Sequence, residues 1–383
     1  MECAEADCVE AYNLIGQCYE RGLGTEQNLT EALNWYQKSA VACQDLEAMC
    51  KVAYMYGEGS AVEQSHEEAL YWYHQAAETG AYPVAQYFIG LYHKEGLGGL
   101  DGDAEVAKIY FRKAADQGDA RAMYELANIL WSKRAYNPAM SYYEEAASCG
   151  ISDALRTLGY FYHEGVSSSA GSDMCVIPKD YEFAFGYFLR ASTLNDPTAT
   201  ILVGAYYENG YYVEQNRDTA LKYYKKAAEI GGGSIAEMAI GQLLHNMEQH
   251  DEAVEWLTQA VEHGSAPAEK LLALYHLHGW GGVEQDVDLG FSQLLAMAEK
   301  GQSEAFLEVA KCYELGVGVE QDLEQAFGWW SEASAMEDDV EAVVKTAECY
   351  EYGLGTDVNL LKARDLYQVA ADMGNVLIYF TKN

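Results

Sequence analysis

The segment YERGLGTEQNLTEALNWYQKSA at residues 19–40 decides the fold, because nearly the same string occurs twice more along the chain. It returns as YENGYYVEQNRDTALKYYKKAA at residues 207–228 and as YELGVGVEQDLEQAFGWWSEAS at residues 313–334. A catalytic loop is expected once in a chain, whereas a string that recurs at a regular spacing indicates a repeated structural unit. The 383 residues are therefore interpreted first as a repeat array.

The first half of each repeat is predicted to be an α-helix. Apolar or small residues recur at positions zero, four, five and eight after an aligned alanine, which marks one face of a helix. Position five is always glycine or alanine. Because a glycine inside a helix lowers stability, its recurrence predicts that another helix packs closely at this position. The ten aligned alanines, most of them 37 residues apart, are Ala11, Ala48, Ala85, Ala122, Ala154, Ala199, Ala236, Ala268, Ala305 and Ala342.

The second half of each repeat is predicted to be another helix. A Gly-rich segment such as Gly22-Leu23-Gly24 ends the first helix, because glycine adopts the left-handed backbone that stops a helix. The second helix carries an aromatic pair such as Trp35-Tyr36, which we expect to fill the space left by small residues on neighbouring helices. In the eight longer repeats a polar residue that can cap the exposed amides of a helix start precedes this helix. These caps are Asn28, Ser65, Asp103, Asp180, Asn216, Asp286, Asp322 and Asn359.

This unit resembles the repeat of the Sel-one-like repeat (SLR) family, relatives of the tetratricopeptide repeat with a longer connection between the two helices. The family pattern A-x-x-x-L-G-x-x-Y-x-x-G-x-G is matched by Ala11, Ile15, Gly16, Tyr19, Gly22 and Gly24. The pattern D-x-x-x-A-x-x-W-Y-x-x-A-A is matched by Asn28, Ala32, Trp35, Tyr36, Ser39 and Ala40. The resemblance covers essentially the whole chain.

We therefore expect an all-α fold, a right-handed α/α superhelix (solenoid) of about ten helix-turn-helix units and no sheet. Residues 1–383 are expected to form a single repeat domain, with a truncated eleventh unit at 375–383. The repeats at 122–153 and 236–267 lack five connecting residues and the usual cap. The repeat at 154–198 gains a polar, Ser-rich insertion, whose segment 166–179 is expected to be the most mobile part of the chain.

The charge of the chain bears on its partners. Asp and Glu number 60 against 24 Lys and Arg, for a formal net charge of −36. Such a surface repels phosphate backbones and anionic lipid heads, so the expected partner is a protein or peptide with a basic segment, and neither nucleic acid nor a membrane. The alternative is that the charge only confers solubility. The sequence says nothing of the oligomeric state.

The compartment is inferred from what the sequence lacks. No apolar run reaches the length of a membrane helix, and the start MECAEADCVEAYN has no signal-peptide pattern. Nine cysteines without secretory context are interpreted as reduced thiols of a cytoplasmic protein. A pairing of Cys43 with Cys50 keeps a secreted or periplasmic alternative open.

Motifs of catalysis and of cofactor or metal binding are missing. The segment GLGGLDGD at 96–103 joins two predicted helices, and no G-x-x-x-x-G-K-[ST], S-x-x-K or G-x-S-x-G occurs. HEEAL at 66–70 lacks the second His of a zinc motif, and His276 and His278 are two residues apart on different helix faces. A catalytic Cys–His pair is not excluded by the sequence, since the chain has nine cysteines and nine histidines. We expect no enzyme activity, no cofactor and no metal.

A binding surface is expected beside the packed stripe of the first helices. By the resemblance to tetratricopeptide repeats, positions two, six and nine of these helices face a concave groove. In the second to fifth repeats this stripe is rich in aromatic residues, which dominate interaction hot spots, although such rings can also just fill the interior of a tight superhelix. The candidate residues are Tyr54, Tyr87, Tyr124, Asn128, Trp131, Tyr160 and His163.

The function expected from these observations is a non-enzymatic scaffold or adaptor that binds a protein or peptide in an acidic, aromatic groove. The alternative is an exported or envelope-associated SLR protein that acts as a host-contact factor or enzyme regulator. Counting the free thiols of the unreduced protein would separate the two, because nine free thiols favour the cytoplasmic scaffold.

Overall fold

The computed structural model describes residues 11–168, 175–336 and 339–382, with side chains up to residue 373 except at positions 168 and 175. The chain divides into two compact units, Met1–Leu194 and Asn195–Asn383. The boundary falls between the fifth and the sixth repeat. The single repeat domain over 1–383 and the right hand of its superhelix stay predictions.

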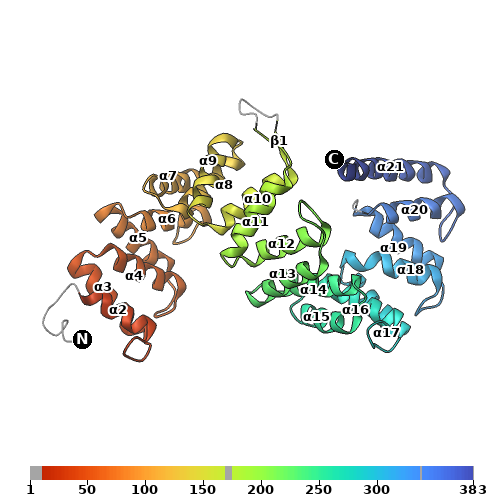
Figure 1. The fold of residues 1–383 in the computed structure, drawn as a ribbon, viewed down its shortest axis with the longest axis horizontal. Coiled ribbons are helices and arrows are strands. Elements are labelled where there is room, and N and C mark those ends of the chain that lie inside the picture. Colours follow the sequence, from red (N-terminus) through yellow and green to blue (C-terminus); the bar gives the residue numbers. More distant parts are fainter. Residues whose placement is uncertain (1–10, 169–174, 337–338, 383) are drawn as a thin grey trace. The chain divides into compact units, whose positions relative to one another are not determined.

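The described part of unit one contains five helix pairs (Figure 1). Each pair is one predicted repeat, and each first helix contacts its own partner and, after the first pair, the second helix of the preceding pair. The pairs are α2 (Tyr12–Arg21) with α3 (Leu29–Cys43), α4 (Leu46–Glu58) with α5 (His66–Gly80), α6 (Pro83–Glu95) with α7 (Ala104–Ala115), α8 (Ala120–Ser132) with α9 (Tyr136–Ser148), and α10 (Ser152–Glu164) with α11 (Tyr181–Thr193).

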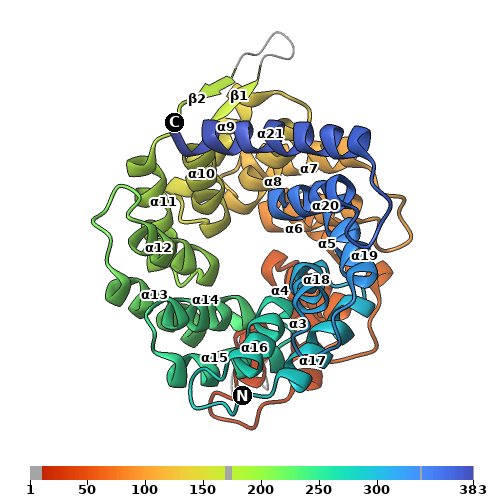
Figure 2. The same ribbon diagram turned by 90° about the vertical axis from the view of Figure 1, so that its right-hand side faces the viewer.

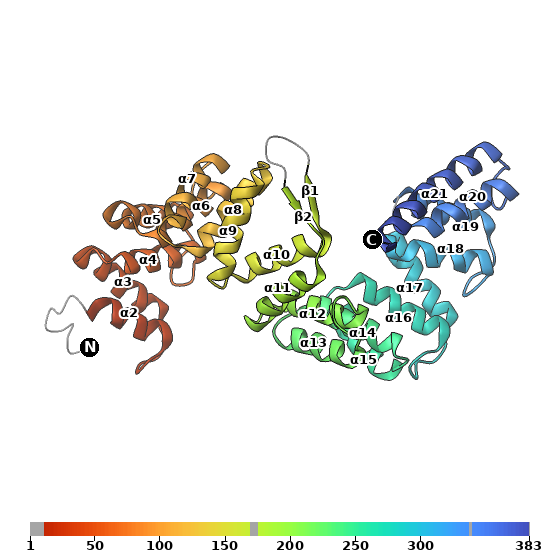
Figure 3. The same ribbon diagram turned by 45° about the horizontal axis from the view of Figure 1, so that its top comes forward.

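The described part of unit two repeats this plan with five further pairs (Figures 2 and 3). A short 3₁₀ turn, Ser303–Ala305, leads into its fourth pair. The pairs are α12 (Pro197–Asn209) with α13 (Arg217–Glu229), α14 (Gly233–Asn246) with α15 (His250–Glu262), α16 (Ala266–His278) with α17 (Val287–Glu299), α18 (Phe306–Leu315) with α19 (Leu323–Ala335), and α20 (Val340–Tyr352) with α21 (Leu360–Lys382). The predicted all-α repeat fold is confirmed.

The predicted caps are confirmed as well. All eight side chains accept a hydrogen bond from a backbone N–H two or three residues further on, such as Asn28 from Glu31 at 3.0 Å. Several first helices have caps that were not predicted from the sequence. These are Asp45, Asp119, Asp196, Ser265 and Asp339.

The close helix contact at position five is also confirmed. A Cβ atom placed on Gly90 in α6 would lie 2.6 Å from the Phe111 ring of α7, and one on Gly204 would lie 2.6 Å from the Tyr224 ring. Carbon atoms in contact are normally about 3.5–4.0 Å apart. Glycine therefore lets the buried aromatic residue of the second helix reach the backbone of the first.

The buried face of the first helices is wider than predicted. Position seven is more deeply buried than position eight in most repeats, because the first helix lies between two second helices and packs on both sides. Only the two short repeats bury a leucine at position eight, Leu130 and Leu244. The buried residues at position seven are Met55, Tyr92, Ile129, Tyr206, Leu243, Tyr275, Cys312 and Cys349.

The prediction of no sheet is wrong at one place. Val166–Ser168 (β1) and Cys175–Ile177 (β2) form a two-stranded antiparallel sheet in which Val166 pairs with Ile177. The insertion of the fifth repeat leaves α10 and returns to α11, so its two ends run side by side and their backbones can pair. The middle of the predicted mobile segment, residues 169–174, lies outside the described residues.

At its C-terminal end the backbone of α21 continues through residues 375–382 as one helix with the tenth repeat. The truncated eleventh unit at 375–383 stays a prediction. No helix in the described ranges has the length and apolar character needed to span a membrane.

Candidate functional site

The predicted stripe lies on four neighbouring first helices, all in unit one. Tyr54 is on α4, Tyr87 is on α6, and Tyr160 is on α10, while α8 carries three more of the candidates. The side chains differ in exposure. Tyr54 is 49% exposed and Tyr160 is 40% exposed, whereas the other five candidates are half-buried.

The three candidates on α8 are engaged in packing. Trp131 stacks on Phe161 of the next repeat with ring centroids 4.1 Å apart. The Tyr143 hydroxyl donates a hydrogen bond of 2.7 Å to Asn128 Oδ1, and the Tyr124 ring lies 5.9 Å from the Tyr143 ring. At these positions the alternative of interior filling describes the side chains better than an open binding surface.

Tyr87 and His163 are partly covered. The Arg121 guanidinium carbon lies 4.5 Å from the centroid of the Tyr87 ring, within the range of a cation–π contact. The His163 ring lies 5.3 Å from the Tyr181 ring. Burial lowers the pKa of His163, more than the neighbouring Glu164 raises it, so the neutral imidazole is favoured.

A hollow of about 260 Å³ opens beside Tyr54, between α4 and the start of α6. Its lining is mainly apolar, and a cavity of this kind suits a large side chain from another molecule. Cys50 is 8% exposed and carries a free thiol, and burial raises its pKa to about 12, so the thiol stays protonated. The lining residues are Glu47, Cys50, Lys51, Tyr54, Tyr82, Val84 and Phe88.

Most of this lining was not predicted from the sequence. Phe88 occupies position three of its repeat, and Tyr82 lies before α6 begins, so neither belongs to the stripe at positions two, six and nine. A usable signal was present, because Phe88 is the aromatic residue at a position that holds Lys51 in the preceding repeat and Glu125 in the next.

The lysines of the first-helix face are held by glutamates. Lys51 Nζ lies 2.9 Å from Glu20 Oε1, and Lys94 Nζ lies 2.9 Å from Glu125 Oε2. Each pair joins position nine of one repeat to position three of the next. Glu20 also accepts a hydrogen bond of 2.6 Å from the buried Tyr36 hydroxyl. Burial by itself would raise the pKa of Glu20, but the hydrogen bonds from Tyr36 and Lys51 outweigh it and lower the pKa.

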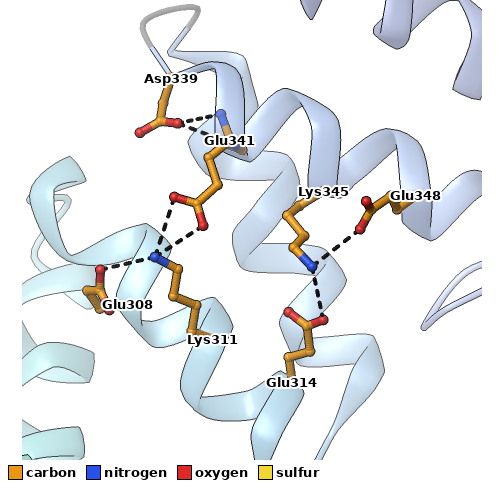
Figure 4. A network of polar contacts seen from close by, with 8 residues as sticks. Glu308, Lys311, Glu314, Asp339, Glu341, Lys345 and Glu348 are labelled. Atoms are coloured by element: carbon orange, nitrogen blue, oxygen red, sulfur yellow. Dashed lines mark hydrogen bonds and ion pairs between the residues drawn. The ribbon is translucent and has the colours of Figure 1, made fainter.

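The ninth and tenth repeats in unit two show the same arrangement with more carboxylates (Figure 4). Lys311 lies 3.4 Å from Glu308 and 3.2 Å from Glu341. Figure 4 also shows Lys345 between two further carboxylates, 3.5 Å from Glu314 and 3.3 Å from Glu348. This face is therefore charged, whereas the corresponding face of unit one is aromatic.

The cysteines and the possible metal ligands were also considered in the sequence. Cys50 is not in a disulfide, so the pairing of Cys43 with Cys50 that the sequence left open is not formed. Within the described residues no group of three or more His, Cys, Asp or Glu side chains is placed to hold a metal ion.

Comparison with known sequences identifies the repeat. The Sel1 repeat profile matches eight segments, residues 9–40, 46–80, 83–119, 152–196, 197–232, 266–301, 303–338 and 340–375. The chain belongs to the Sel1 repeat family. The tetratricopeptide repeat profile matches residues 120–148 and 238–262, which lie in the two repeats with the short connection. The Sel1 protein thus carries two tetratricopeptide-like repeats within its array.

Similar proteins come from animals, fungi and bacteria. The chain is 26% identical over 199 residues to protein sel-1 homolog 2 of Homo sapiens, which covers 48% of this chain and 28% of that protein. It is 25% identical over 264 residues to the chitin synthase regulator SKT5 of Saccharomyces cerevisiae, which covers 67% of this chain and 28% of that protein. It is 29% identical over 176 residues to the Sel1-repeat-containing protein YjcO of Escherichia coli, which covers 43% of this chain and 73% of that protein. The matched part thus spans under a third of the human and yeast relatives.

A solved structure has the same fold. A protective antigen of uropathogenic Escherichia coli that displays an SLR fold superposes with a TM-score of 0.63 at 23% sequence identity. The match covers 97% of this chain and 85% of that chain. At this identity the likeness shows the fold alone.

Proposed function

We propose that this Sel1 repeat protein is a non-enzymatic scaffold that holds a protein partner on the first-helix face of unit one. The observation that carries the proposal is the half-exposed Tyr54 ring beside the apolar hollow of α4 and α6. Tyr54 and Tyr87 are the proposed contact residues, together with the hollow. Tyr124, Asn128, Trp131 and the region around them support that surface by packing.

The hollow suits an apolar anchor from the partner. A volume of about 260 Å³ accommodates one large aromatic or aliphatic side chain, and a ring that packs against Tyr54 and Phe88 would bury apolar area on both molecules. The Tyr54 side chain loses little conformational freedom on binding, since it has only two side-chain torsions. We therefore assign most of the short-range binding energy to this hollow.

The charge of the chain supports a basic segment in the partner. The formal net charge is −36, and the lysines Lys51 and Lys94 near this face are already paired with carboxylates. An acidic surface speeds the encounter with a basic segment, and this attraction weakens as the salt concentration rises. The same charge disfavours nucleic acid, and we propose neither a cofactor nor insertion into a membrane.

The names of two relatives fit such a role. SKT5 and a second match in Schizosaccharomyces pombe are chitin synthase regulators, so Sel1 repeats occur in proteins that regulate another protein. We carry over only this class of role. We place the protein in the cytoplasm, a proposal supported by the free thiols of Cys18, Cys50, Cys149, Cys312 and Cys349. Titration of the denatured, unreduced chain that yields fewer than nine thiols would favour export instead.

Capture from native lysate with the immobilised full chain tests the proposal. Tyr54→Ala should release most of the main partner, and high salt should weaken its retention by the wild type. The matched control is Tyr71→Ala, because Tyr71 on α5 is 54% exposed but does not line the hollow. Equal loss in both variants, or full retention by a folded Tyr54→Ala chain, would place the partner elsewhere.

A further inference from the structure

Two histidines share one buried hydroxyl in unit two. The Nδ1 atoms of His245 and His250 each lie 3.1 Å from the Tyr275 hydroxyl oxygen. Their rings are 5.2 Å apart, and the Tyr275 residue is 0% exposed. Trp280 closes the cluster, with its ring 4.9 Å from His245 and 5.8 Å from His250.

The cluster joins two repeats. His245 is near the end of α14 and His250 begins α15, so both belong to the seventh repeat. Tyr275 is on α16 and Trp280 is in the connection that follows it, so both belong to the eighth. The connection packs tightly here, since a Cβ atom on Gly281 would lie 2.6 Å from the backbone oxygen of His250. The hydrogen bonds therefore cross the boundary between the repeats.

The protons of this cluster can be counted. A tyrosine hydroxyl donates one hydrogen bond and accepts others, and a neutral imidazole nitrogen either donates or accepts. With at most one imidazole charged, Tyr275 donates to one Nδ1 and accepts from the other, so both contacts are satisfied. With both imidazoles charged, both Nδ1 atoms are donors, so the hydroxyl proton loses its acceptor while two positive rings stand 5.2 Å apart.

We propose that the His245–Tyr275–His250 cluster is a pH-sensitive joint between the seventh and eighth repeats, closed at neutral pH and loosened when both imidazoles carry a proton. The joint responds to the second proton rather than the first, because only the second one breaks the hydrogen-bond pattern. The two protonation steps belong to the pair as a whole.

The surrounding groups set the direction of the response. Burial and the charge of His250 both lower the pKa of His245. An imidazole with a lowered pKa contributes stability above its ordinary value of 6.5, and this stability is lost as the pH falls through the lowered pKa. The joint should therefore loosen as the pH falls below 6.5.

Other charged and titratable groups lie on the elements that surround the cluster. On α13, Arg217 donates to the Asn246 backbone oxygen at 3.5 Å; on α15, Asp251 lies beside Gly282 and Glu252 is held by Lys225 at 2.6 Å. From α16 and its end, His276 and His278 add two imidazoles, and the His278 ring stacks on Trp280 at 4.5 Å. In the seventh repeat, at the other ends of α14 and α15, His263 pairs with the buried Glu237 at 2.8 Å, which raises the pKa of His263. That pair strengthens in acid, so it holds α14 to α15 while the contact with α16 loosens.

Unit one contains an internal control. His66 begins α5 and lies 3.4 Å from the Tyr92 hydroxyl, which matches His250 and Tyr275 in position. The place of His245 is taken there by Gly57, so no second imidazole reaches the hydroxyl. The joint between the second and third repeats should therefore not respond in the same way.

Hydrogen–deuterium exchange of the full chain at about pH 7.5 and about pH 5.5, corrected for the intrinsic rate, tests the joint. Protection of α14–α16 should fall about tenfold or more in the wild type, while α4–α6 keep their protection. His250→Gln should abolish most of the fall, whereas His276→Gln, next to Tyr275 on α16 but not bonded to its hydroxyl, should leave it unchanged. An equal fall in His250→Gln, or no fall in the wild type, overturns the proposal.

A measurement on the wild type alone covers the case in which His250→Gln fails to fold. Nuclear magnetic resonance titration of the imidazole protons should show His245 and His250 titrating as a coupled pair, with the second step below the ordinary range. Two independent titrations at ordinary values overturn the proposal as well.

Discussion

Replacement of Gly90 by leucine perturbs the contact that defines the repeat. An ideal Cβ on Gly90 lies 2.6, 2.7 and 3.1 Å from three carbons of the Phe111 ring, so even the first added atom overlaps the ring by close to 1 Å against the contact distance of about 3.5–4.0 Å. Phe111 is fully buried between helices, so it has no solvent to move into. The leucine side chain must therefore displace α7 from α6.

The expected magnitude follows from two opposing effects. Overpacking costs about 1–3 kcal/mol, and we take the upper value of about 3 because the ring is fully buried. Replacing a helical glycine contributes about 1 kcal/mol of stabilisation through helix propensity. The net loss should be about 2 kcal/mol, concentrated in α6 and α7.

Gly186→Leu is the matched control. Gly186 lies inside α11 of the same unit, and a Cβ atom there would meet nothing within 4 Å. The same substitution should therefore stabilise the chain by about 0.5–1 kcal/mol. Gly99→Ala is a poorer control, because Gly99 has a φ of +78°, which strains any L side chain.

Thermal melting and hydrogen exchange of α6 and α7 give the readout. Opposite signs for the two leucine variants, with local loss of protection around Gly90, would support the packing argument. If Gly90→Leu were as stable as Gly186→Leu, the alignment on position five would have no structural meaning.

Three further predictions concern hydrogen bonds and caps. Tyr36→Phe should lower the free energy of unfolding, measured by urea titration, by about 1–2 kcal/mol, because the hydrogen bond to Glu20 is lost. In the same assay Tyr71→Phe, at an exposed position, should change it by less than about 0.5 kcal/mol. Asn216→Ala should cost about 1 kcal/mol in the same assay, because the start of α13 loses its cap, and Asn216→Asp should restore it. Lys51→Met should destabilise the chain at about pH 7, and this destabilisation should shrink as the pH falls below 4.5, because the lowered pKa of Glu20 makes the pair contribute above 4.5 and lose its effect as the carboxylate is protonated. A constant difference between wild type and Lys51→Met across this range in thermal melts would contradict it.

The repeat was predictable because its determinants lie close together in the sequence. A cap such as Asn216 acts two or three residues away, and a glycine such as Gly204 meets an aromatic residue twenty positions later in the same repeat. Interactions of these two kinds recur in most of the repeats, so each repeat supports the interpretation of the others. The buried position seven was missed because it depends on the second helix of the preceding repeat.

The site was predicted less well, because side chains at comparable positions meet different neighbours. Trp131 is covered by Phe161 of the next repeat, whereas Tyr54 lies beside a hollow and stays half exposed. The repeat pattern is the same in both places. The difference arises from residues outside the stripe, such as Tyr82 and Phe88, and these contacts are set by three-dimensional packing. For the same reason, replacing Tyr124 and Trp131 would damage the fold as well as any binding surface.

The β1–β2 hairpin could not be read from the repeat plan either. It is confined to the insertion of the fifth repeat, where no other unit offers a pattern for comparison. Short strands with a polar connection carry a weak sequence signal. The hairpin changes the local path of the chain and leaves the helix pair of α10 and α11 in place.

Photo-cross-linking from position 54 tests the central claim most directly. A benzoylphenylalanine residue in place of Tyr54 should cross-link one main protein in native lysate, through a peptide that carries Lys or Arg beside an apolar side chain. The same probe in place of Tyr71, which is equally exposed on α5 but does not line the hollow, should not cross-link that protein. A probe at position 54 that captures nothing, or captures the same proteins as the probe at position 71, would contradict the proposal that unit one binds its partner at this hollow.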